Sequence, residues 1–161
     1  MSQPTLKEVA IIGVTFGKNV TVVTPSNLYG CVIGDDSFIG PFVEIQRDVF
    51  IGRRCRIQSH TFICELVKLG NDCFVGHGVM FVNDLFKDGK PARGNRSAWK
   101  STNIGNNVSI GSNATLLSVN ICDDVVIGAG AVVTKDIAKP GVYAGNPARL
   151  LRPLSPRSAK G

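Results

Sequence analysis

The chain has 161 residues, a formal net charge of +6 and 43% hydrophobic residues. This length suits one domain, and so many apolar residues exclude a disordered chain. No apolar run reaches the roughly 18 residues that span a membrane, and Met1 to Glu8 lack the layout of a secretion signal. These features predict a cytoplasmic protein without membrane insertion.

The main feature of the sequence is a six-residue repeat between Ile33 and Phe86. A period of six fits neither the 3.6-residue period of a helix nor the two-residue alternation of a strand. It predicts a short strand, a corner, and then the same unit again. A small or aliphatic residue stands four places after each anchor. The anchors, which should point inward, are Ile33, Ile39, Ile45, Ile51, Ile57, Ile63, Leu69, Val75 and Phe81.

The repeat is irregular at Pro25 to Gly30, is later interrupted by one long segment, and then slips once. It begins near Phe16 and stops after Asn83, where residues 84–102 are polar, basic and rich in Gly and Pro. Segments this long without structure of their own are usually functional, so we expect an excursion loop. The repeat returns at Ile104, with a slip of one residue within 117–120.

Three six-residue sides make a coil of about 18 residues, so we predict an all-β triangular prism of stacked parallel strands. The whole chain, 1–161, forms one domain with roughly six coils over about 10–137. A C-terminal cap should cover 138–152 and a frayed tail 153–161. Glycines near the corners are expected to adopt backbone angles that other residues resist.

The cysteines and the charges narrow the function classes. Cys55 and Cys73 occupy the small-residue slot of the repeat, which predicts buried free thiols and no disulfide or zinc framework. Residues 84–102 carry five basic and two acidic side chains, and residues 135–161 six and one. This clustering favours a phosphate-bearing ligand over an ordinary solvated surface. Nucleic acid binding is not expected, because no recognition helix or aromatic platform is evident.

Residues 18 apart should stack in one column, about 5 Å from one another. Arg47, Glu65 and Asn83 form such a column, each two places after an anchor. They are predicted to converge on one ligand, and the alternative is a solvated ladder at a corner. A pair between Arg47 and Glu65 would lower the basicity of the carboxylate.

Two pairs of motifs resemble a known family. IGAGAVVTKDI (127–137) followed by AGNPARLL (144–151) is similar to the C-terminal signature of coenzyme-A-dependent, left-handed parallel β-helix acyltransferases. QSHTFICE (58–65) and GHGVMFVND (76–84) resemble, more narrowly, the N-acetyltransferases of nucleotide-linked amino sugars. The resemblance covers about residues 10–152. It implies a left-handed coil and a homotrimer that binds acetyl-CoA between subunits.

The catalytic candidates are Asn83, Glu65 and His77, and the resemblance supports the first two as residues of the substrate site. Many O-acetyltransferases of the family carry a catalytic His where this chain has Asn83 and Asp84, and this departure favours an amine acceptor over a hydroxyl. His77 follows a different corner and is expected to join the Asn83 site across a trimer interface. The proton acceptor stays open between Glu65 and His77. His60 is assigned a structural role.

The donor is expected to bind along the last coils. Ser112 and Ala129 each follow their anchors by two places, and the slip restores their stacking. Small side chains there leave room for the pantetheine arm. The resemblance implies phosphate contacts from Lys135 and Arg149 and places Asn146 near the adenine.

The loop supplies the remaining substrate contacts. Asp84 and Arg93 join Arg47 as predicted substrate-binding residues, with the basic loop residues holding a diphosphate or covering a neighbouring site. Trp99 either stacks on a base or anchors the loop by packing.

The leading hypothesis is N-acetylation of a dTDP- or UDP-linked amino sugar by acetyl-CoA, in surface glycan synthesis. No Ser-His-Asp or Cys-His arrangement is evident, so direct transfer without an acyl-enzyme is expected. The alternatives are an O-acetyltransferase of a sugar or small hydroxyl acceptor and a non-catalytic assembly module. A zinc lyase on the same prism needs three histidines, and this chain has two, so no metal is expected.

Overall fold

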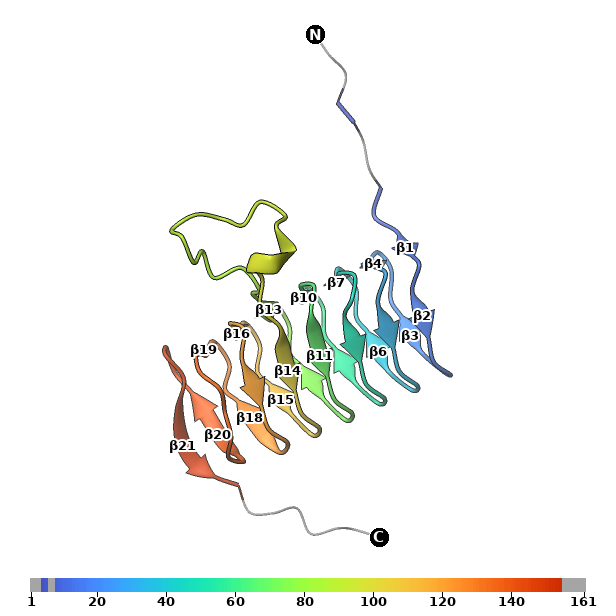
Figure 1. Cartoon of the computed structure of the whole chain (residues 1–161). Helices are drawn as coiled ribbons and strands as arrows, with labels where there is room; N and C mark the ends of the chain where they lie inside the picture. Colours follow the sequence, from blue (N-terminus) through green and yellow to red (C-terminus); the bar gives the residue numbers. More distant parts are fainter. Residues whose placement is uncertain (1–3, 6–7, 155–161) are drawn as a thin grey trace.

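The computed structural model describes residues 4–5 and 8–154 (Figure 1). Most of the lead-in over 1–8 and residues 155–161 of the expected tail lie outside the described residues. The described chain winds into a solenoid of short strands stacked in parallel, which confirms the predicted all-β parallel β-helix. Its winding is consistent with a left-handed coil.

Three sheets form the faces of the prism, and we call them sheets A, B and C. Sheet A contains β1 (Ile11–Ile12), β4 (Asn27–Tyr29), β7 (Glu44–Ile45), β10 (Phe62–Ile63), β13 (Met80–Phe81), β16 (Thr115–Leu116) and β19 (Val132–Val133). Sheet B contains β2 (Thr15–Phe16), β5 (Val32–Ile33), β8 (Phe50–Ile51), β11 (Val67–Leu69), β14 (Thr102–Ile104) and β17 (Asn120–Ile121). Sheet C contains β3 (Thr21–Val22), β6 (Phe38–Ile39), β9 (Arg56–Ile57), β12 (Phe74–Val75), β15 (Ser109–Ile110), β18 (Val125–Ile127), β20 (Gly141–Ala144) and β21 (Arg149–Pro153).

The core of the prism is the stack of anchors. All nine are at most 1% exposed, and burying each such side chain stabilises the fold by about 1.5–3 kcal/mol. Polar side chains in the small-residue slot bond to the next coil. The Ser37 hydroxyl donates to the Gly52 carbonyl and the Thr61 hydroxyl to the Gly76 carbonyl, both at 3.0 Å. Cys55 and Cys73 are buried free thiols, as predicted.

The expectation about the glycines holds at only some corners, such as Gly30, Gly78 and Gly130 with φ of 60°, 65° and 68°. The left-handed corner residues are mostly not glycine: Asp36, Asp48 and Asp72, for example, have φ of 58°, 59° and 58°. The glycines that follow the anchors are instead required because of close stacking. A Cβ on Gly76 would lie 2.6 Å from the Ser112 backbone nitrogen on the next coil. The repeat therefore needs glycine where consecutive coils touch.

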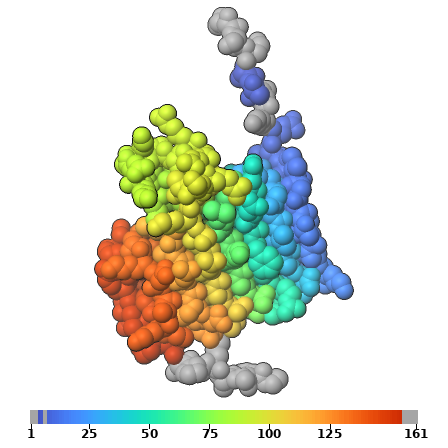
Figure 2. Space-filling model, in the orientation of Figure 1, coloured from blue at the N-terminus to red at the C-terminus, as the bar shows by residue number. Residues whose placement is uncertain are grey.

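The loop and the slip leave the stacking of coils intact. Sheet A has seven strands, which gives one turn more than expected, because the chain already pairs at Ile11 with Leu28. The loop between β13 and β14 projects from the prism as a lobe of its own (Figure 2) and contains one short 3₁₀ helix, η1 (Arg96–Ala98). β14 pairs with β17 at Asn103 and Asn120, a step of 17 that accommodates the slip.

The expected cap is an antiparallel hairpin of β20 and β21, which extends sheet C. β21 runs to Pro153, one residue into the segment assigned to the tail. The hairpin turn is fixed to β19, because the Val132 N–H donates to the Gly145 carbonyl (3.0 Å) and the Ala148 N–H donates to the Val132 carbonyl (2.8 Å). The turn is therefore held against the last coil.

Candidate functional site

The corner between sheets A and B, which we call the A–B corner, carries the predicted polar column. Arg47, Glu65 and Asn83 follow β7, β10 and β13, which are neighbours in sheet A. Glu65 is 8% exposed. Its Oε1 lies 3.4 Å from Arg47 Nε, and the Asn83 side-chain amide donates to its backbone carbonyl at 3.2 Å. The structure therefore brings all three residues together.

A residue that sequence reasoning missed completes this corner. Arg96 of η1 places its Nε 3.1 Å from Glu65 Oε2 and donates through Nη2 to Asp48 at 2.5 Å. The hydrogen bond to Asp48, with the charge of Glu65 beside it, raises the pKa of the Arg96 guanidinium. Asp48 is 48 positions away in the chain, and the loop lies outside the repeat, so counting coils could not find the contact. The only signal was the basic character of the loop.

A cavity of about 540 Å³ lies between this corner and the loop. Phe62, Met80 and Trp99 give it apolar walls, and Glu65 and Asn83 give it a polar edge. Trp99, a predicted substrate residue, thus lines the same cavity as Asn83. The remaining lining residues are Gln46, Cys64, Phe81, Val82, Asp84 and Phe86.

Cys64 is the thiol on this cavity, and it is 3% exposed. Burial raises the pKa of Cys64 to about 12. The thiol is therefore protonated near neutral pH and is a poor nucleophile.

The other two predicted substrate residues of the loop, Asp84 and Arg93, differ from each other in their surroundings. Asp84 holds the loop, because its carboxylate accepts from the backbone N–H groups of Phe86 (3.0 Å) and Ala92 (2.7 Å). Arg93 is exposed, at a left-handed backbone position in the loop with φ 51°, and it is not among the residues that line the cavity.

The corner between sheets C and A, the C–A corner, carries a second column. His77, Ser112 and Ala129 each follow paired strands of sheet C by two places, since Val75 pairs with Ile110 and Ile110 with Ile127. His77 is exposed, and its Nδ1 lies 2.8 Å from the Ser59 hydroxyl one coil earlier. Counting the anchors in threes across the loop could have shown that His77 shares its corner with the predicted coenzyme residues. The structure does not bring His77 and Asn83 to the same corner of one chain.

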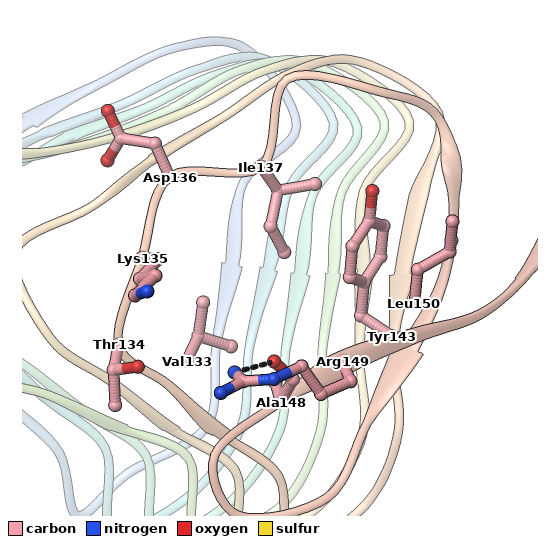
Figure 3. A pocket seen from close by; sticks show the side chains of 9 residues that line it. All are labelled: Val133, Thr134, Lys135, Asp136, Ile137, Tyr143, Ala148, Arg149 and Leu150. Atoms are coloured by element: carbon pink, nitrogen blue, oxygen red, sulfur yellow. Dashed lines mark hydrogen bonds between the residues drawn. The ribbon is translucent and has the colours of Figure 1, made fainter.

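The last coil and the hairpin border an open cavity of about 320 Å³ (Figure 3). Lys135 and Arg149 both line it, as do Tyr143 and Leu150, which lie side by side. The Arg149 guanidinium donates to the Ala148 carbonyl at 2.9 Å. Asn146 is exposed on the hairpin turn, outside this lining. Two predicted phosphate contacts thus share one cavity.

Asp136 also borders this cavity but points away from it in Figure 3. Its carboxylate accepts from the Asn120 side-chain amide (3.0 Å) and backbone N–H (2.8 Å). These two hydrogen bonds lower the pKa of Asp136. Its role is therefore to join two coils.

The described part of the chain shows neither a cluster of metal-binding side chains nor a membrane-spanning helix. Over 4–5 and 8–154, no cluster of three or more His, Cys, Asp or Glu side chains is suited to a metal ion. In the same part of the chain, no helix has the length and apolar character needed to cross a membrane.

Two family models match the repeats. The bacterial transferase hexapeptide (six repeats) matches residues 30–65, and the hexapeptide repeat of succinyl-transferase matches residues 102–135. The chain therefore carries transferase-type hexapeptide repeats on both sides of the excursion loop.

Particular proteins resemble the chain in part or in fold. It is 51% identical over 55 residues to the galactoside O-acetyltransferase of Escherichia coli (strain K12). The aligned stretch covers 34% of this chain and 27% of that protein. The N-acyltransferase AntD from Bacillus cereus, solved with dTDP and coenzyme A, superposes with a TM-score of 0.76 at 19% identity, over 88% of this chain and 84% of that one. The GDP-perosamine N-acetyltransferase of Caulobacter crescentus, solved with coenzyme A and GDP-perosamine, superposes with a TM-score of 0.61 at 20% identity. The superposition covers 88% of this chain and 57% of that one. The two structures show a shared fold, and the matched stretch spans about a quarter of the curated relative's length.

Proposed function

We propose that the chain transfers an acetyl group from acetyl-CoA to the amine of a nucleotide-linked amino sugar, carrying dTDP or UDP. The observation that carries this proposal is the cavity at the A–B corner, with aromatic and apolar walls and the polar edge of Glu65 and Asn83. Such a site suits a ligand with a flat base and a polar sugar. The nucleotide and coenzyme A bound to the two solved N-acyltransferases support the assignment.

In this proposal Asn83 orients the acceptor. Its side-chain amide nitrogen donates to the Glu65 carbonyl, which leaves its carbonyl oxygen to accept from the substrate amine. Holding a neutral amine in line with the thioester carbonyl is the main requirement of the reaction. The amine nitrogen bonds to that carbonyl carbon, the carbon–sulfur bond breaks, and coenzyme A leaves as the thiol.

His77 is proposed as the acceptor of the amine proton, in place of Glu65. Each oxygen of Glu65 lies in an ion pair, Oε1 with Arg47 and Oε2 with Arg96, so the carboxylate already serves to hold those two guanidinium groups. The contact of His77 Nδ1 with Ser59 leaves Nε2 to face a substrate. Because His77 and Asn83 stand at different corners, a homotrimer in which the corners of neighbouring subunits meet would assemble the site.

The donor is proposed to lie along the C–A corner. Ser112 and Ala129 leave room there for the pantetheine arm, and backbone N–H groups at this edge would stabilise the oxyanion. Lys135 and Arg149 would bind the coenzyme phosphates, with Asn146 near the adenine. The high pKa of Cys64 supports direct transfer without an acyl-enzyme. The product suits cytoplasmic synthesis of a surface glycan.

An O-acetyltransferase is the second candidate. The 51% identical stretch in the E. coli galactoside O-acetyltransferase favours it. So does the His77–Ser59 contact, because a hydroxyl acceptor needs a stronger base than an amine does.

The test is release of free coenzyme A thiol from acetyl-CoA in the presence of dTDP-, UDP- and GDP-linked amino sugars. Matched nucleotide sugars with a hydroxyl in place of the amine, and a simple galactoside, serve as controls. Release with an amino sugar alone is the expected result. Release with the hydroxyl compounds alone would replace the proposal by the second candidate, and absence of both turnover and acetyl-CoA binding would indicate an assembly module.

A further inference from the structure

Arg96 joins the excursion loop to two consecutive coils of the prism. Its Nη2 donates to Asp48 at 2.5 Å and its Nε lies 3.1 Å from Glu65 Oε2. Asp48 follows β7 and Glu65 follows β10, which are neighbours in sheet A. A single guanidinium therefore spans two coils, which its fork of donors permits and a lysine ammonium does not.

The burial of Glu65 makes this contact more than an ordinary surface pair. Its side chain is 11% exposed, against 53% for Asp48. Glu65 Oε2 is fully buried, and within the described chain no donor meets hydrogen-bond geometry at it. The positive charge of Arg96 at 3.1 Å therefore compensates an oxygen that water does not reach.

Arg96 and Trp99 are the first residue and the C-cap of the same short helix, η1, so the position of one fixes that of the other. The N-cap Asn95 accepts from the Ser97 N–H at 3.2 Å, and the Trp99 N–H donates to the Arg96 carbonyl at 3.1 Å. The next residue, Lys100, donates its N–H to the Asn83 carbonyl at 3.0 Å. Trp99 is thus held between two attachments to the A–B corner, and it forms a wall of the cavity there.

We propose that Arg96 is a positioning residue that fixes Trp99 as the wall of the acceptor cavity and so sets the affinity for the nucleotide-linked acceptor. The kinetic part of this inference rests on the proposed function, whereas the position of Trp99 does not. Loss of Arg96 removes binding that ground state and transition state share, which raises KM and leaves kcat nearly unchanged.

The test uses Trp99 as its own probe, since it is the single tryptophan of the chain. Arg96→Gln should shift its emission to longer wavelength and increase its quenching by acrylamide, because the closed-to-open ratio of the loop falls by a factor of about 5–30. Arg96→Lys and Asp48→Asn should give intermediate shifts, since each retains one attachment. These milder variants keep the test valid if Arg96→Gln folds poorly.

Arg54→Gln is the matched control. Arg54 makes a two-pronged contact with Asp72, at 2.6 and 2.7 Å, between sheets B and C. The Arg54→Gln variant loses the same charge and a similar ion pair, but away from the loop. Its Trp99 emission should therefore match that of the wild type.

The kinetic expectation is a KM for the acceptor raised about 5–30-fold in Arg96→Gln, with kcat within about threefold. The inference would be overturned if Trp99 emission in Arg96→Gln, Arg96→Lys and Asp48→Asn equalled that of Arg54→Gln. Shifted emission with unchanged KM would also overturn it. Shifted emission in a protein without turnover on any acceptor would retain the positioning role and reject the proposed function.

Discussion

The A–B and C–A corners are built from the same six-residue repeat, yet their side chains differ in size and charge. At the A–B corner the position two places after the anchor holds Arg47, Glu65 and Asn83, and a loop attaches across it. At the C–A corner the same position holds His77, Ser112 and Ala129, with little side-chain bulk on the last coils. One repeat position thus gives a polar column at one corner, where we propose the acceptor site, and an open edge at the other, where we propose the donor site.

The largest effect is expected from a change at His77, the titratable residue of the column at the C–A corner. If His77 accepts the amine proton, His77→Ala should lower kcat by a factor of about 10²–10⁴. Ser59→Ala should cost about tenfold, since it removes only the hydrogen bond that orients the ring. Steady-state kinetics at saturating acetyl-CoA measures both. Full activity in His77→Ala would remove the C–A corner from the chemistry.

Filling the open edge should be nearly as damaging. Ala129 is exposed, so Ala129→Trp should fold normally but lower kcat/KM for acetyl-CoA by at least about a hundredfold, because the arm is displaced. Arg53→Trp is the control, since Arg53 holds the same repeat position, two places after Ile51, between sheets B and C. Equal losses in the two variants would mean that the effect is not specific to the donor edge.

These two corners also show how far the sequence alone could lead. The anchors, the slip and the column of Arg47, Glu65 and Asn83 follow from counting, because stacked coils translate sequence spacing directly into position. The contact of Arg96 with Asp48 could not be counted, because it depends on how an irregular loop folds back. The reason for the glycines that follow the anchors was missed for a similar reason, because the backbone contacts of neighbouring coils are not visible in the repeat itself.

The acceptor corner should contribute to stability as well as to binding. Glu65→Ala removes a buried carboxylate from between two arginines and should reduce the free energy of unfolding by about 1–3 kcal/mol. Glu65→Gln keeps the shape and should cost less. Urea unfolding of both variants gives the comparison. No loss in either would show that the buried charge is not needed for the fold.

The smallest effect concerns the far end of the A–B corner. Hydrogen bonds from Asn120 lower the pKa of Asp136 below its ordinary value of 3.8. The stabilisation is therefore present above that value and is lost as the pH falls through the lowered pKa of the folded state. Asp136 is exposed, so Asp136→Asn should cost at most about 0.5 kcal/mol at pH 7. Thermal melting at pH 7 and pH 3 should show the difference from wild type shrinking in acid, and a constant difference would contradict this assignment.

The central claim, that the two corners meet across a subunit interface, is tested most directly by mixing two defective variants. Asn83→Ala and His77→Ala subunits are co-refolded in equal amounts and assayed for acetyl transfer. In a closed ring of three, random mixing restores one intact site in most trimers, so about a quarter of wild-type activity should return. Mixed oligomers with no more activity than the separate variants would contradict the account.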